Sequence, residues 1–194
     1  MKGKKPWLLI LGICLILASL CLMVSFELRM HMGTQNSQEV LSQITALLPE
    51  RTQGMAGLYP NATMPVLEID GADYVAVLEI PAFGLTLPVA DQWDSNRLHS
   101  APARFSGSAY DRTLVIGGAD YPGQFSFCDK IDNGAVITVT DMTGAQFTYT
   151  VSRVDRASHA EAQWLAPADC DMTLFCRSAY SWEYIAVRCV SNPK

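Results

Sequence analysis

The 194-residue chain has few charged residues, few histidines and no basic cluster beyond its first five residues. Asp, Glu, Lys and Arg together make up 17% of the sequence, below the roughly 25% typical of soluble domains. The formal net charge is −5, whereas nucleic-acid-binding domains carry a concentrated basic patch. The sequence also lacks internal repeats and low-complexity tracts. These absences exclude a coiled coil, a collagen-like fibre, a disordered acidic tail and a basic nucleic-acid-binding protein.

Histidine is scarce, and His31, His99 and His159 lie far apart in the sequence. Zinc sites need three or four Cys or His ligands at short, characteristic spacings. The six cysteines do not form such a pattern with these histidines. The sequence therefore predicts neither a metal nor a cofactor.

The low charge count has its source near the N-terminus. Residues 7–26 (WLLILGICLILASLCLMVSF) contain no charged side chain, and twenty helical residues span about 30 Å, the thickness of a bilayer core. Lys2, Lys4 and Lys5 precede this run, which favours a cytoplasmic N-terminus and an exported C-terminal part. A cleaved signal peptide is the alternative, but its apolar region is usually about 7–15 residues and ends at an Ala-x-Ala-like site. We expect residues 1–6 to be a cytoplasmic tail and 7–26 a signal anchor in the cell membrane, with the rest extracellular.

The part of the chain behind this anchor is acidic and begins with a stalk. Residues 30–194 carry ten basic and eighteen acidic residues, a net charge of −8. Residues 27–65 are expected to form a helical stalk, interrupted at Gly33, and a linker. Apolar residues between Val40 and Leu48 fall at helical spacing, and the stretch 49–65 is rich in Pro, Gly and polar residues.

From residue 66 onward, short β-type runs follow one another. They are rich in β-branched and aromatic residues and end at Gly, Pro or polar turns. Residues 141–144 are expected to form a hairpin turn, and short helices are expected at 94–98 and 124–130. The pattern predicts an all-β barrel or sandwich for residues 66–194, which is long enough for one hydrophobic core. The expected strands are 74–80, 84–89, 113–116, 135–140, 145–151, 172–176 and 184–190.

Five segments of this region carry patterns that are informative in combination. They are LEIPAFGLTLPV (78–89), TLVIGG (113–118), the stretch 125–137, GAQFTYTV (144–151) and the stretch 171–189. In this order they resemble the sortases, membrane-anchored cysteine transpeptidases of Gram-positive bacteria. The resemblance implies a mainly β fold, a sortase-like closed barrel of about eight strands with short helices, preceded by the transmembrane helix and the stalk.

The resemblance also implies three catalytic positions, and this sequence departs from the family at each of them. Sortases use a cysteine nucleophile, a histidine for proton transfer and an arginine that stabilises the oxyanion. When the segments are aligned without a gap, the histidine position falls on Ala119, the cysteine position on Arg177 and the arginine position on Tyr184. An alanine cannot move a proton. The resemblance therefore predicts a catalytically degenerate site, that is, a pseudoenzyme.

Cys176 keeps an active enzyme open as an alternative. It lies one residue before the nucleophile position, next to Arg177, and a cationic neighbour favours the thiolate form of a cysteine. Successive side chains of a strand point to opposite faces, so the Cys176 thiol is expected to point away from the site. Using it would require a one-residue shift at the strand end.

Further residues near these positions are candidates for the lining of a peptide groove, with surface or packing roles as the alternatives. Asp120 is expected to form an ion pair with Arg177, and His159 is a candidate substitute for the missing imidazole. Cys170 and Cys189 would approach each other if 172–176 and 184–190 pair antiparallel, which permits a disulfide outside the cell; buried thiols are the alternative. The groove candidates are Asp120, Tyr121, His159, Tyr180 and Trp182.

Three functions remain open at this point. The first is a degenerate sortase at the cell surface that binds sorting-signal peptides or assists an active sortase. The second is an active transpeptidase that uses Cys176 to cleave a sorting motif and to attach surface proteins to the cell wall or pilins to one another. The third is a purely structural barrel. The expected partners are a sorting-signal peptide or surface protein, an active sortase and the membrane, but no nucleic acid.

Overall fold

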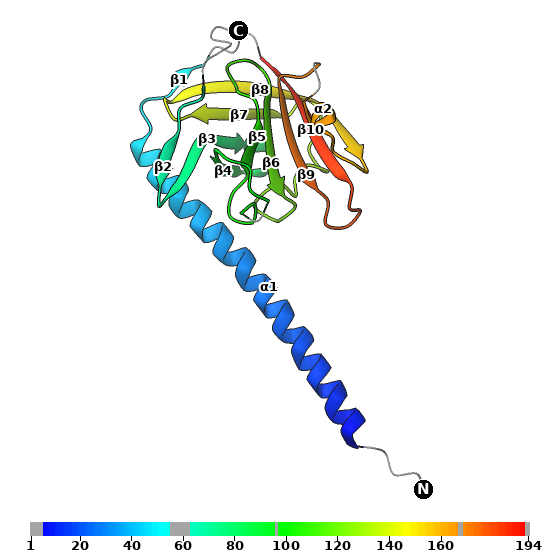
Figure 1. Ribbon diagram of the computed structural model, residues 1–194. Helices are drawn as coiled ribbons and strands as arrows, with labels where there is room; N and C mark the ends of the chain where they lie inside the picture. Colours follow the sequence, from blue (N-terminus) through cyan, green and yellow to red (C-terminus); the bar gives the residue numbers. More distant parts are fainter. Residues whose placement is uncertain (1–5, 55–62, 96, 167–168, 193–194) are drawn as a thin grey trace.

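One long helix leads into a closed barrel of strands, and the N-terminal end of this helix lies far from the barrel (Figure 1). The computed structural model describes residues 6–54, 63–95, 97–166 and 169–192. The elements in chain order are α1 (Pro6–Leu47), β1 (Thr52–Gln53), β2 (Leu67–Ile69), β3 (Ala72–Ile80), the 3₁₀ turn η1 (Pro81–Phe83), β4 (Leu85–Ala90), β5 (Ala103–Ser106), β6 (Leu114–Ala119), β7 (Val136–Asp141), β8 (Ala145–Ala157), α2 (Ala162–Leu165), β9 (Met172–Arg177) and β10 (Tyr184–Ser191).

Within the described residues, eight strands close into a ring. The ring runs β3, β4, β5, β6, β9, β10, β8 and β7, and β7 pairs with β3 to complete it. β1 and β2 add to β8 and β3 as short extensions. Most neighbours in the ring are antiparallel, but β4 runs parallel to β5 and β6 runs parallel to β9. The closed barrel of about eight strands expected from the sequence is confirmed.

The turn predicted at residues 141–144 connects β7 and β8, and its lead residue holds it together. The buried carboxylate of Asp141 accepts hydrogen bonds from the backbone N–H groups of Thr143 (2.8 Å) and Ala145 (3.0 Å). The Tyr110 hydroxyl donates to the same carboxylate. Gly144 has φ +82°, a conformation that glycine adopts without steric penalty.

Two expected helices are absent from the described chain, and one short helix was not expected. Residues 97–100 and 122–130 form successive turns instead. Several of their hydrogen bonds join residues three apart, as in Arg97 N to Asp94 O and Cys128 N to Phe125 O, so each stretch bends rather than continuing as a helix. Helix α2 and strand β5 are too short to produce a periodic sequence signal.

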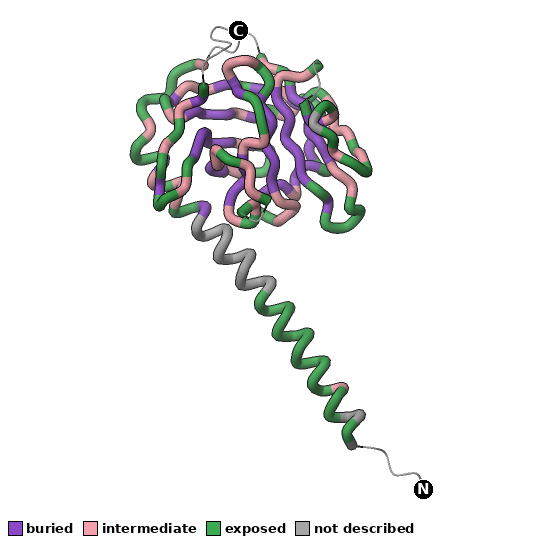
Figure 2. The backbone as a smooth tube through the Cα atoms, viewed as in Figure 1, coloured by how far each residue is buried: buried purple, intermediate pink, exposed green. Residues whose placement is uncertain are grey.

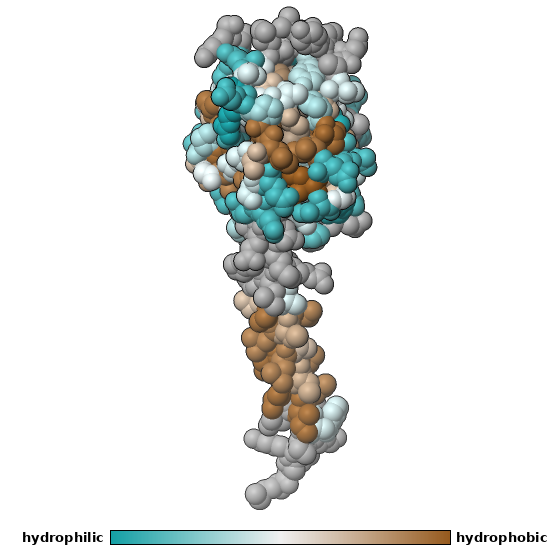
Figure 3. Space-filling model, turned by 90° about the vertical axis from the view of Figure 1, so that its left-hand side faces the viewer, coloured by the Kyte–Doolittle hydropathy of each residue, from teal (hydrophilic) through white to brown (hydrophobic). Residues whose placement is uncertain are grey.

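Helix α1 runs through Gly33 without a break, so the expected interruption is wrong. A glycine inside a helix lowers helix stability by only about 1 kcal/mol relative to alanine, which is not enough to interrupt a helix of 42 residues. Its C-terminal turns pack on the barrel, where Ile44 is buried against Ile69, Tyr74 and Val77. The N-terminal half is apolar on its exposed surface (Figure 3). No helix in the described part of the chain combines the length and the apolarity that a membrane span requires.

The strands β6, β9 and β10 are covered on both faces, and their burial is therefore nearly continuous (Figure 2). One face points into the barrel, where Ile116, Leu174 and Val187 join the main core. The other face carries a second cluster of Val115, Leu165, Phe175 and Ala186. Runs without alternation are typical of strands buried on both sides.

The cysteines of the described chain form no disulfide. The expected approach of Cys170 to Cys189 is present in the strand register, because Cys189 pairs with Met172 and the Asp171 N–H donates to the Cys189 carbonyl at 2.9 Å. Burial raises the pKa of the Cys189 thiol, and the neighbouring Cys170 adds to this shift. The structure thus matches the alternative of reduced thiols.

A buried arginine fastens the segment between β8 and β9 to the barrel. Arg188 is 1% exposed, and its guanidinium donates to Asp155 (2.9 Å), Thr173 (3.0 Å) and the carbonyl of Leu165 (3.0 Å). It also donates to the Trp164 carbonyl and lies 4.6 Å from the centre of that indole ring. Buried charges are tolerated when they are paired and hydrogen-bonded in this way.

Replacing Arg188 tests this role. Arg188→Leu removes the donors for two carbonyls and for Thr173 and leaves Asp155 paired with Arg153 alone, so we expect the free energy of unfolding to fall by about 3 kcal/mol. Arg156→Leu, at an exposed arginine of β8, is the matched control and should change it by less than about 0.5 kcal/mol. Urea unfolding followed by circular dichroism measures both. Equal stabilities of the two variants would contradict the role assigned to Arg188.

Candidate functional site

Ala119, Arg177 and Tyr184 lie side by side in one row across three neighbouring strands. Ala119 pairs with Arg177 in the parallel ladder of β6 and β9. Arg177 pairs with Tyr184 in the antiparallel ladder of β9 and β10, and Tyr184 pairs with Ala157 of β8. The row lies where β6 and β9 end and β10 begins. The fold thus assembles the three positions that the sequence places up to 65 residues apart.

Arg177 is the charged member of this row, and aromatic rings hold it in place. Its guanidinium carbon lies 5.1 Å from the ring centre of Trp182 and 5.8 Å from that of Tyr184. Its Nε donates to the Trp182 carbonyl oxygen at 3.3 Å. Arginine favours such stacking because its planar charge is weakly hydrated. The side chain is exposed, so its charge faces solvent while the two rings and the Trp182 carbonyl hold the guanidinium in position.

Asp120 supports the loop between β9 and β10 rather than pairing with Arg177. Its carboxylate accepts a hydrogen bond from the backbone N–H of Ala179 at 2.8 Å. Among the described residues, no ion pair joins Asp120 to Arg177, so the expected pairing is wrong. The carboxylate instead satisfies a loop donor, which ties the end of β6 to residues 178–183.

Cys176 points into the barrel. It is 1% exposed, and its thiol lies 3.7 Å from the carbonyl oxygen of Phe125. Burial raises the pKa of the adjacent Cys128 thiol well above its ordinary value, and a hydrogen bond with Cys176 adds to the shift. The alternation of side chains along β9 therefore places Arg177 outside and Cys176 inside. A peptide lying along the row does not meet this thiol.

The sheet face next to the row is filled by aromatic side chains that sequence reasoning missed. Trp93, from the loop after β4, stacks on Phe175 with ring centres 5.4 Å apart, and the edge of Phe105 closes the cluster at 5.2 Å from Trp93. A Cβ at Gly117 would overlap the Trp93 indole and lie 2.7 Å from Phe175. A glycine inside a strand is a signal for such a close approach, but it does not identify the approaching side chain.

The other groove candidates are distributed around the row. Tyr180 and Trp182 occupy the β9–β10 loop and are 94% and 65% exposed. Tyr121 lies two residues after Ala119, and its N–H donates to the Ala119 carbonyl at 2.8 Å. His159 is exposed two residues beyond Ala157, with its Nδ1 3.0 Å from the Ser158 hydroxyl. The structure thus brings Asp120, Tyr121, Tyr180 and Trp182 to the row and places His159 beyond its far end.

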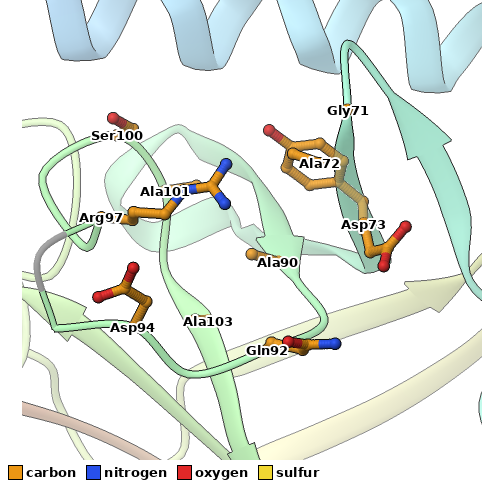
Figure 4. Close-up of a pocket in the computed structure, with 11 residues that line it drawn as sticks. Gly71, Ala72, Asp73, Ala90, Gln92, Asp94, Arg97, Ser100, Ala101 and Ala103 are labelled. Carbon is orange, nitrogen blue, oxygen red and sulfur yellow. The ribbon is translucent and has the colours of Figure 1, made fainter.

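Two pockets elsewhere on the barrel are lined by other residues. One, of about 210 Å³, lies beside α1 and includes Asp94, Arg97 and Ser100 (Figure 4). Another, of about 420 Å³, includes Cys170 and Asp171 and lies at the opposite ends of β6 and β9 from the row. The described side chains form no cluster of three or more metal-ligating groups.

Comparison with known proteins gives one family. A model of the sortase domain matches residues 78–189 of the chain, which is more than half of its length. Among curated proteins none matches.

Solved structures of sortases share the fold. Sortase A from Corynebacterium diphtheriae superposes with a TM-score of 0.55 at 17% identity, over 85% of this chain and 85% of that chain. Sortase C1 from Streptococcus agalactiae gives 0.54 at 20% identity, over 70% and 74%. A Clostridium perfringens Sortase D5 transpeptidase gives 0.52 at 19% identity, over 62% and 79%. At these identities the likeness establishes the fold alone.

The opposite orientations of Cys176 and Arg177 generate a prediction about thiol reactivity. We expect Cys176 of the native chain to react with a maleimide on the order of 100-fold more slowly than a small-molecule thiol, because reaction requires local opening. The variant Arg177→Cys should gain one rapidly modified thiol at position 177. Peptide mapping by mass spectrometry separates these sites from the exposed Cys14 and Cys21. Rapid modification of Cys176 in the native chain would contradict the inward orientation.

Proposed function

The chain belongs to the sortase family, and from this premise we propose that it is a catalytically degenerate member that binds sorting-signal peptides or assists an active sortase. The row of Ala119, Arg177 and Tyr184 is the observation that carries the proposal. These three residues occupy adjacent places on the sheet, at the positions to which the family resemblance assigns the histidine, cysteine and arginine.

The chemistry of the row supports a loss of catalysis. Acyl transfer through a covalent intermediate needs an activated nucleophile, a general acid–base group and a donor for the oxyanion. The methyl group of Ala119 cannot transfer a proton, and the permanently protonated guanidinium of Arg177 is not a nucleophile. The nearest thiol along β9, that of Cys176, lies on the other face of the strand.

The surface beside the row supports binding. Arg, Tyr and Trp are the residue types that most often dominate the energy of protein interfaces, and Arg177, Tyr180 and Trp182 all lie exposed within six residues of one another. Trp93 and Phe175 already fill the sheet face next to the row. A peptide would therefore bind over the β9–β10 loop rather than deep against the strands.

The N-terminal helix supports a location at the cell membrane, with the barrel extracellular. Between Trp7 and Val24, the large apolar side chains of α1 that the structure describes are 47% to 71% exposed, an arrangement that water disfavours and a lipid environment favours. The β9–β10 loop lies at the end of the barrel from which α1 extends (Figure 1). An anchored helix would then hold the binding surface toward the membrane, where a membrane-attached partner could reach it.

A peptide-binding experiment with the purified full chain in detergent tests the function. Sorting-type peptides that carry an electrophile at the scissile bond are incubated with the native chain and with Cys176→Ala. We expect binding by calorimetry, no covalent adduct by mass spectrometry, and affinities of the two proteins within about twofold of each other. An adduct on Cys176 would show instead an active transpeptidase.

A pair of surface variants separates binding at the loop from non-specific adhesion. Trp182→Ala removes an exposed aromatic anchor beside Arg177, so we expect peptide affinity to fall about tenfold or more. Val190→Ala is the matched control, because Val190 is an exposed apolar residue at the other end of β10. Equal weakening by both variants would contradict binding at the β9–β10 loop, and absence of binding by every peptide would leave the purely structural role.

A further inference from the structure

Arg177 differs from the ion-paired arginines of the barrel. The described structure pairs Arg51 with Glu79, Arg104 with Asp91, and Arg188 with Asp155. Arg177 forms no such pair within the described residues; two rings and one carbonyl oxygen hold it. Its Nε donates the hydrogen bond to that carbonyl oxygen, which belongs to Trp182. The two Nη groups remain for a ligand, because the side chain is exposed.

The loop that carries the rings is built to hold its shape. The Ser178 N–H donates to the Glu183 carbonyl at 2.8 Å, and the Trp182 N–H donates to the Ser178 carbonyl at 3.2 Å. The Ser178 hydroxyl accepts from the N–H groups of Tyr180 and Ser181 at 3.3 Å. Together with the Asp120 bond to Ala179, these contacts fix both ends and the middle of the loop.

Trp182 adopts a backbone conformation that is unfavourable for a bulky residue. Its φ is +61°, in the left-handed region where most side chains other than glycine are strained. Strain of this kind persists where the surroundings enforce it, and it concentrates at ligand-binding sites. Here the conformation places the indole over Arg177 while 65% of Trp182 stays exposed. The exposed ring and the guanidinium thus form one preorganised surface.

We propose that this surface, made of Arg177, Trp182 and Tyr184 with Tyr180 at its edge, recognises a carboxylate group of the bound peptide. This inference rests on the proposed peptide-binding function and names the chemistry that the site selects. The planar fork of a guanidinium matches the two oxygens of a carboxylate. The rings beside it favour an apolar or aromatic neighbour of that carboxylate in the peptide.

The surrounding charges favour a carboxylate over a phosphate. The carboxylates of Asp120 and Glu183 belong to the loop and its support, and the part of the chain behind the apolar helix carries a net charge of −8. Their field opposes any anion, and it opposes a phosphate dianion more than a singly charged carboxylate. The single positive charge of Arg177 balances the one negative charge of a carboxylate but only half of the charge of a phosphate dianion.

The test compares four forms of one sorting-type peptide with the full chain in detergent. The forms carry either a free C-terminus or a C-terminal amide, and either an aspartate or an asparagine next to an aromatic residue. We expect the forms that retain the recognised carboxylate to bind about tenfold more tightly than the form with none, which corresponds to about 1.4 kcal/mol. Two of the forms retain only one carboxylate each: the amidated peptide with aspartate and the peptide with a free C-terminus and asparagine. Comparing their affinities identifies whether the surface binds the C-terminal or the side-chain carboxylate.

Variants of the receptor assign the preference to Arg177. Arg177→Gln should abolish the tenfold preference, and Arg177→Lys, which keeps the charge but lacks the fork, should retain only part of it. Arg156→Gln, at an exposed arginine of the neighbouring strand β8, should leave the preference unchanged. Circular dichroism verifies that the variants are folded.

The outcomes distinguish the two levels of the proposal. Equal affinities of all four peptide forms for the native chain would overturn carboxylate recognition while the peptide-binding function stands. A preference that survives Arg177→Gln would overturn the assignment to this surface. Absence of binding by every form would overturn the peptide-binding function and this inference with it.

Discussion

The parallel pairing of β6 with β9 is the constraint on which the rest of the site depends. It brings Ala119 next to Arg177, and the antiparallel pairing of β9 with β10 adds Tyr184 to the same row. Because side chains alternate along a strand, this register also decides which residue of the Cys176–Arg177 pair faces outward. A shift by one residue would exchange the thiol and the guanidinium between the two faces of β9.

The second constraint is the double coverage of these same strands. The barrel core packs against one face, and Trp93, Phe105, Phe175 and the segment held by Arg188 pack against the other. Strands fixed from both sides have little freedom to change register. At the level of Phe175 this outer face is filled by Trp93 and Phe105, and the exposed side chains of Arg177 and Trp182 lie in the row and its loop. The row and the exposed loop therefore belong to one arrangement.

The position of α1 connects the site to its surroundings. Its last turns pack on β2 and β3 through Ile44, so the helix is part of the domain rather than a flexible tether. Its apolar N-terminal half extends from the end of the barrel that carries the β9–β10 loop (Figure 1). Under the proposed membrane location, the same packing that stabilises the barrel also orients the binding surface.

The sequence by itself determined the fold class, the order of most strands and the hairpin turn at Asp141, because local patterns and ordered motifs carry that information. Alternation along one strand also predicted that the Cys176 thiol points inward. Only the tertiary structure decided what surrounds these residues. The stacking of Trp182 and Tyr184 on Arg177, the use of Asp120 as a loop support and the covering of Gly117 by Trp93 join residues from separate strands and loops. Such contacts depend on the register and on side-chain packing between distant segments, which no local pattern encodes.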